Sequence, residues 1–154
     1  MTEREDPLRS LRRFLAEEVG CEPSPSPAQR AGGSAETHFE LGVAYVQMGL
    51  LEDAVRELGR AAEEPRLRAS SAALLGSVHL ERGDLERAIG WYRCGLATRG
   101  LPRRTRVGLL QDLGRAHQMA GDERQAARAF TQAAQIDQSF RELSTVPLSD
   151  VLGT

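Results

Sequence analysis

Residues 41–58 read LGVAYVQMGLLEDAVREL, and the order of residue types in this stretch occurs twice more along the chain. A Leu-Gly pair is followed by an aromatic residue or His, a second Gly, an Ala and a large residue, in copies at 41–58, 75–92 and 113–130. The Leu-Gly pairs of the first two copies lie 34 residues apart. Because a period of about 34 residues is typical of stacked helix pairs, the sequence predicts an all-α array of helical repeats.

Each copy carries the signals of two helices joined by a tight turn. Gly49, Gly83 and Gly121 are expected to end the first helices, because glycine adopts the left-handed conformation without a side-chain clash. Asp84 and Asp122 are expected to cap the second helices that follow. Close approach of the two helices is expected at the small residues Gly42, Gly76, Gly114, Ala54, Ala88 and Ala126, while Leu58, Tyr92 and Phe130 are expected to fill the space between pairs.

The first helix of each copy is predicted to carry an apolar packing stripe. In the first copy, Leu41, Tyr45 and Met48 recur at roughly helical spacing, and Leu80 and Met119 are assigned the same role in the later copies. The first copy also has a second apolar stripe of Phe39, Val43 and Val46. A helix that is apolar on two faces is expected to contact two partners.

At these positions the chain resembles the tetratricopeptide repeat family, from Ala35 to about Gln138. The usual Trp position instead holds His38, Ala72 and Leu110, and the Pro that closes a repeat has moved to Pro65 in the first copy. The resemblance implies a right-handed superhelical stack of three helix pairs, with repeats at about 35–68, 69–102 and 107–140. A flanking N-terminal helix and a C-terminal capping segment complete the expected fold.

The third copy begins late, because four extra residues lie within 98–106. Four residues are about one helical turn. The third pair is therefore expected to have a longer first helix, started by Pro102.

Two segments flank the expected repeat domain of residues 35–141. Residues 1–20 are predicted to contain an amphipathic helix whose apolar stripe is Leu8, Leu11, Leu15 and Val19, and residues 21–34 form a Pro/Ser/Gly-rich linker. This helix either caps the first pair, occupies the groove, or docks on a partner. At the other end, Phe140 and Leu143 are expected to close the stack, ahead of a tail at 142–154.

Composition favours a small soluble domain, with 40% hydrophobic and 27% charged residues and a net charge of −2. No apolar run approaches the roughly 18 residues of a membrane span, and the start of the chain does not read as a signal peptide. Cys21 and Cys94 show no metal or disulfide spacing. All 20 basic residues are Arg, a bias that we interpret as bacterial. A cytoplasmic location is the resulting expectation.

The sequence offers little catalytic chemistry. His79 and His117 occupy the position of Tyr45, so a core role is favoured over a catalytic or metal-binding one. No phosphate-binding loop, nucleophile elbow or metal-ligand pair stands out. We therefore predict no enzymatic activity, no metal, no cofactor and no small-molecule substrate.

Arginines gather between the second and third copies, at Arg99, Arg103, Arg104 and Arg106. This cluster is either a solvated loop or a docking patch for an acidic protein segment. Nucleic acid is not expected as a partner, because the chain has a negative net charge and 5% aromatic residues.

By resemblance to the family, one face of the first helices lines a concave groove that binds peptides. The residues at those offsets are Phe39, Val43, Val46, Gln47, Ala73, Ser77, Leu80, Glu81, Gln111, Arg115, Gln118 and Met119. A clamp for a free C-terminal carboxylate is not expected, because the chain contains no Lys. The predicted function is a scaffold or adaptor that binds a peptide or helix of a partner protein, with an acidic end near Arg115. The alternative is a structural subunit whose apolar surface forms a homodimer or joins a larger complex.

Overall fold

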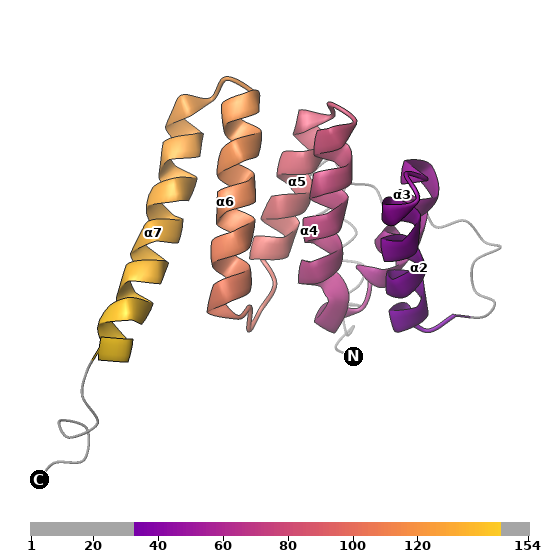
Figure 1. Cartoon of the computed structure of the whole chain (residues 1–154), viewed down its shortest axis with the longest axis horizontal. Helices are drawn as coiled ribbons and strands as arrows, with labels where there is room; N and C mark the ends of the chain where they lie inside the picture. The colour runs from indigo at the N-terminus through magenta and orange to yellow at the C-terminus, as the bar shows by residue number, and fades with distance from the viewer. Residues whose placement is uncertain (1–32, 146–154) are drawn as a thin grey trace, which may run out of the picture. The chain divides into compact units, whose positions relative to one another are not determined.

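The computed structural model describes the backbone of residues 33–145 and the side chains of residues 33–138. Within this part of the chain all regular structure is helical. Two compact units divide at Leu101 and Pro102. The helices of the first unit are α2 (Ala35–Gln47), α3 (Leu51–Ala61), α4 (Pro65–Glu81) and α5 (Leu85–Leu96). Those of the second unit are α6 (Arg103–Met119) and α7 (Glu123–Thr145), as labelled in Figure 1.

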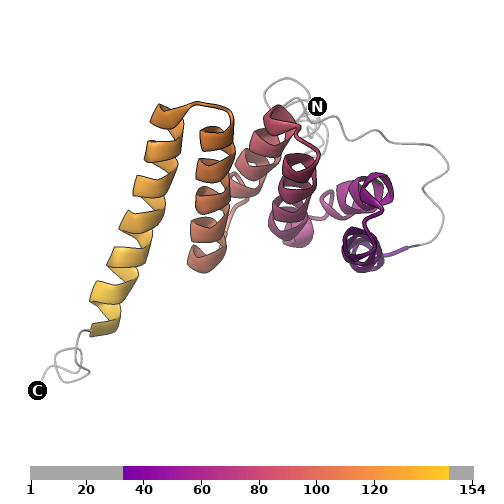
Figure 2. The same ribbon diagram turned by 45° about the horizontal axis from the view of Figure 1, so that its top comes forward.

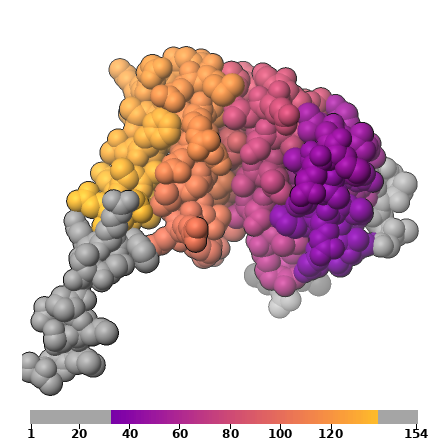
Figure 3. Space-filling model, in the orientation of Figure 1, coloured from indigo at the N-terminus to yellow at the C-terminus, as the bar shows by residue number. Residues whose placement is uncertain are grey.

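Consecutive helices form antiparallel pairs, which confirms the predicted all-α fold of helix pairs. In the first unit α2 packs on α3 and α4 on α5, and the pairs join through contacts of α4 with α3 and α2 (Figure 2). Figure 3 shows the atoms of this first pair in indigo lying directly against those of α4. In the second unit α6 packs on α7. None of the described helices is both long and apolar enough to cross a membrane.

The turn inside each pair depends on a glycine, as predicted. Gly49, Gly83 and Gly121 have φ values of 75°, 77° and 79°, in the left-handed region that other residues rarely adopt. The backbone N–H after the glycine then donates to a carbonyl five residues back, as in Asp84 N–H to His79 O at 2.9 Å. Asp84 and Asp122 accept hydrogen bonds from the first turns of α5 and α7, which confirms both caps.

The predicted close approach of the helices at the glycines is confirmed. The large residues expected between pairs, Leu58, Tyr92 and Phe130, instead lie against these glycines within their own pair, although Leu58 also joins the two pairs of the first unit. A Cβ added at Gly42 would lie 2.6 Å from the side chain of Leu58, and one at Gly114 would lie 2.6 Å from the ring of Phe130. At Gly76 the added atom would overlap the ring of Tyr92. Glycine is therefore required on each first helix because the second helix fills the space of a side chain.

The core of the first unit joins its two pairs. Leu58 and Ala62 of the first pair pack with Ala72 and Leu75 in the middle of α4, and Trp91 and Cys94 of α5 complete the cluster. Phe39, Val46, Val55 and Leu74 pack against it from the edges. Leu75, the leucine of the Leu-Gly pair in α4, is therefore buried against the preceding helix pair.

The packing stripe predicted for the first helices is wrong at three positions. The side chains of Leu41, Met48 and Met119 are 42%, 60% and 59% exposed, whereas the leucine equivalent to Leu41, Leu75, is fully buried. For Leu41 the reason is its place in the array, since no described helix precedes α2 and nothing comparable to α3 covers it. Met48 and Met119 lie at the last turn of their helices, beside the turn glycines, where solvent reaches them.

The expectation of a longer first helix in the third pair is also wrong. Helices α4 and α6 both contain 17 residues, so three of the four extra residues lengthen the connection at 97–102 and the fourth lies in α5. Gly100 takes a φ of 68° within that connection. Pro102 is the N-cap of α6 and Arg103 its first residue. Pro65, by contrast, is the first residue of α4.

Several expectations lie at or beyond the limits of the described residues. The predicted N-terminal helix with Leu8, Leu11, Leu15 and Val19, most of the linker, and residues 146–154 lie outside them. Phe140 and Leu143 lie in the last turns of α7, which continues without a break to Thr145.

Candidate functional site

In the first unit, the residues expected to line a groove come from α2 and α4, the first helices of their pairs. Gln47, Ser77 and Glu81 are exposed, and the other five are partly buried: Phe39, Val43, Val46, Ala73 and Leu80. We call these eight residues the α2/α4 face. It combines accessible polar side chains with partly accessible apolar ones.

Two residues of the α2/α4 face also have a packing role. Phe39 and Val46 contact the core cluster of the first unit, which accounts for the second apolar stripe seen in the sequence of α2. Val43 lies on the same side of α2, is partly buried, and does not belong to that cluster. Val43 is therefore the apolar position on α2 that is best suited to contact a ligand without disturbing the core.

Hydrogen bonds connect the α2/α4 face to the core. The Ser77 hydroxyl donates to the carbonyl of Ala73 at 3.0 Å and lies 3.5 Å from the hydroxyl of Tyr92. The ring of Tyr92 is the one that fills the space beside Gly76, and the residue is 1% exposed. The sequence predicted only a packing role for Tyr92. No sequence pattern indicated that its hydroxyl would lie near Ser77.

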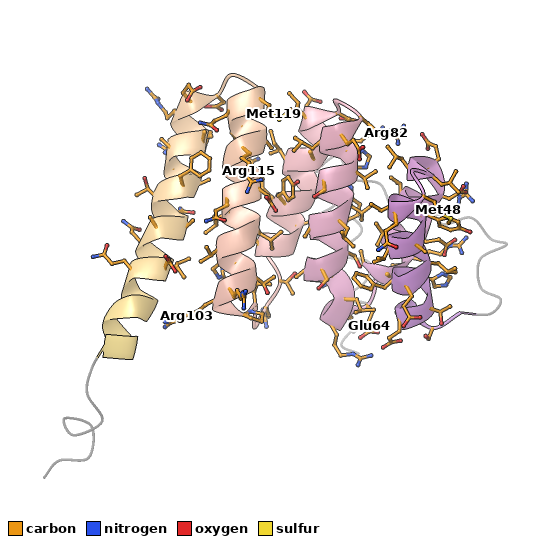
Figure 4. All side chains as sticks on the ribbon, viewed as in Figure 1. Met48, Glu64, Arg82, Arg103, Arg115 and Met119 are labelled. Carbon is orange, nitrogen blue, oxygen red and sulfur yellow. The ribbon has the colours of Figure 1, made fainter. Side chains whose placement is uncertain are left out.

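The second unit presents its candidate residues on α6. Gln111, Arg115, Gln118 and Met119 are all exposed, and Figure 4 labels Arg115 and Met119 on this helix. Arg115 Nη2 lies 3.6 Å from Asp112 Oδ1. Burial raises the pKa of Asp112, and the neighbouring Arg115 opposes that rise. Arg115 therefore has an acidic neighbour of its own as well as access to solvent.

The four clustered arginines belong to two different units. Arg99 belongs to the first unit, whereas Arg103, Arg104 and Arg106 lie in the first turn of α6 in the second unit. Arg103 and Arg104 line a cavity of about 370 Å³ together with Val107, Ile136 and Asp137. The cavity is lined by residues of both α6 and α7, two of them apolar and three charged. Arg106 is partly buried and does not line it.

The histidines and the cysteine of the described residues lie in packing positions or in contacts between helices. His79 and His117 are 3% and 5% exposed, in agreement with a core role. His38 occupies the usual Trp position and lies 2.6 Å from the carboxylate of Glu57, which joins α2 to α3. Burial raises the pKa of the Cys94 thiol to about 11, so this cysteine is a poor nucleophile. The described residues contain no cluster of side chains able to hold a metal ion.

His79 gives the first unit a pH-dependent stability. Burial lowers the pKa of His79, and Asp84, whose Oδ2 lies 3.9 Å from Nδ1, only partly opposes this. The unfolded chain therefore binds a proton more readily than the folded one, and stability falls as the pH drops below the ordinary His value of about 6.5. We expect urea midpoints to decrease between about pH 7.5 and about pH 5.5. The variant His79→Tyr, with the residue found at position 45, should flatten that slope; an equal slope in both proteins would contradict the assignment.

Comparison with known proteins supports the fold. No protein-family model matches the chain, and no curated protein matches its sequence. Among solved structures, the crystal structure of MamA, a protein with tetratricopeptide repeats, is similar with a TM-score of 0.62 and 21% sequence identity. The similarity covers 88% of this chain and 71% of that chain. This chain therefore has a tetratricopeptide-like helical repeat fold.

Proposed function

We propose that this protein is a non-enzymatic scaffold that binds a peptide or helical segment of a partner protein on the first helices of its pairs. The α2/α4 face carries the proposal, because its partly buried apolar residues Val43, Ala73 and Leu80 are accompanied by the exposed polar residues Gln47, Ser77 and Glu81. Repeat folds of this type bury their small-to-large contacts between helices and leave the first-helix faces available for ligands. The absence of any catalytic pattern in the sequence agrees with a binding role.

The chemistry of the face indicates the type of ligand. Partly accessible aliphatic side chains favour a segment with large apolar residues, and the amide, hydroxyl and carboxylate at its edge offer hydrogen bonds that fix its position. On the second unit, Gln111, Arg115, Gln118 and Met119 are proposed to contact a ligand that carries an acidic group. A bacterial source remains the expectation from the lysine-free composition, and a cytoplasmic location remains the default expectation from the sequence.

The experiment selects binders from a random peptide library and measures their affinity for the intact chain and two variants. Val43→Arg with Gln47→Arg places two bulky cations on the α2/α4 face and leaves the core cluster intact. The control, Thr131→Arg with Gln132→Arg, makes the same charge change at exposed positions of α7. We expect the first variant to lose at least about tenfold in affinity, or about 1.4 kcal/mol, and the control to bind normally.

Circular dichroism would verify that both variants are folded. Selected peptides that bind equally well to all three proteins would place the binding surface elsewhere. A library that yields no specific binder at all would favour the alternative, in which the chain is a structural subunit of a homodimer or a larger complex. The exposed leucine and methionine side chains at the end of the first pair are the observation that favours this second function.

A further inference from the structure

Exposed large apolar side chains of the described residues are concentrated at one end of the first unit. Four such residues are exposed, and three of them belong to the first pair: Leu41, Met48 and Leu50, at 42%, 60% and 47%. Tyr45, between them in the sequence, is partly buried. Single exposed leucines are ordinary, but neighbouring ones on a single helix pair indicate a surface that another element covers.

The geometry of α2 places this surface on the side away from α4. Leu41 and Met48 are seven residues apart and so share one face of the helix. Phe39 and Val46 share another, which packs against the core cluster, and the two faces lie roughly 160° apart at 3.6 residues per turn. Gly42, between them, faces Leu58 of α3. Met48 accordingly lies on the outer side of the first pair in Figure 4.

In the second pair, the equivalent surface of α4 is covered by the preceding helix, α3. Leu75, at the position equivalent to Leu41, is fully buried in a cluster with Leu58 and Ala62 of the preceding helix, α3. Among the described residues, no helix precedes α2 to cover Leu41 in the same way. A covering element for α2 therefore needs to be an amphipathic helix that comes before it in the chain, about as long as the 11 residues of α3.

Residues 6–19 have these properties. Their apolar stripe, Leu8, Leu11, Leu15 and Val19, follows helical spacing, and charged side chains occupy most other positions. The described structure begins at Gly33, directly before α2, so residues 20–32 are available as a connection. The equivalent connection between α3 and α4 needs only residues 62–64. Length therefore does not prevent residues 6–19 from reaching the exposed face.

We propose that residues 6–19 pack as a helix on the Leu41–Met48 face and complete the array at its N-terminal end, where α3 would lie relative to α4. The tether favours this occupant over a second copy of the chain, because a short flexible linker gives an effective concentration in the millimolar range. The covered surface is distinct from the α2/α4 face, so the proposal is independent of the proposed peptide-binding site.

Methionine oxidation provides the test, since the chain contains a matched internal control. Met48 and Met119 are 60% and 59% exposed in the described structure, so without a cover they should react with hydrogen peroxide at similar rates. In the full chain we expect Met48 to be oxidised at least about threefold more slowly than Met119, as measured by mass spectrometry of peptides. Leu11→Asp with Leu15→Asp should restore the Met48 rate to that of Met119.

A matched variant and a dilution series distinguish this proposal from other occupants. Ser10→Asp with Arg13→Gln changes the charge by the same amount on the opposite side of the predicted helix, and should leave Met48 protected. Equal oxidation of Met48 and Met119 in the unaltered chain would overturn the proposal. Protection that survives Leu11→Asp with Leu15→Asp, or that disappears on dilution, would also overturn it, because the cover would then be a second copy or another segment.

Discussion

Replacement of Leu75 by Ala is expected to lower the free energy of unfolding of the first unit by about 3 kcal/mol. The side chain of Leu75 is fully buried where the two pairs of this unit meet, among Leu58, Ala62 and Ala72. Its removal loses the transfer free energy of three carbon atoms and leaves a cavity that neighbours on four helices fill only in part. A loss of this size is a large fraction of the 5–15 kcal/mol that stabilises a typical domain.

Denaturation in urea, followed by circular dichroism, would measure the effect. Leu80→Ala, in the same helix, is a suitable control because Leu80 is only partly buried and should cost about 1 kcal/mol or less. Equal losses in the two variants would show that the Leu75 cluster does not join the pairs in the way described.

Replacement of Gly76 by Ala is expected to cost about 2 kcal/mol, although alanine is the better helix former. The added methyl group would overlap the ring of Tyr92, which is 1% exposed and has no free space into which to move. Either α4 and α5 move apart or the ring leaves its rotamer, and both disturb a close-packed interface. Overpacking therefore outweighs the gain in helix propensity.

Gly59→Ala supplies the matched control for Gly76→Ala. Gly59 is also helical, but an added Cβ there would meet no atom within 4 Å. Only the helix-propensity gain remains, so this variant should be more stable than the unaltered chain by about 0.5–1 kcal/mol. Thermal melts of the two variants should therefore shift in opposite directions, and a loss of stability in both would contradict the account of Gly76.

The parts of the fold that depend on local stereochemistry could be predicted from the sequence. Gly83 has to be glycine because of its φ angle, and Asp84 follows it because the next helix needs a cap. Close approach of the two helices at Gly76 is equally visible, because a small residue recurs at this position in each copy, although Tyr92 was expected between the pairs and not beside Gly76. Each of these signals concerns residues within one helix pair, so the sequence contains all the information required.

The parts that depend on the neighbours of a helix could not be predicted. Leu41 and Leu75 occupy the same repeat position, yet Leu75 is buried and Leu41 is exposed, because α3 precedes α4 and the described residues contain no helix before α2. Phe39 and Val46 look like groove residues in the sequence of α2 and turn out to contact the core that α4 supplies. The four-residue insertion could extend either a helix or a connection, and no pattern within it decided between them.

The distribution of aromatic residues makes the first unit optically distinct from the second. The single tryptophan, Trp91, is 6% exposed in the core of the first unit, and both tyrosines, Tyr45 and Tyr92, belong to the same unit. Tryptophan emission therefore reports on the first unit alone, whereas the helical circular dichroism signal comes from both. A single sample, without any label, thus reveals whether α6 and α7 melt together with the first four helices or separately from them.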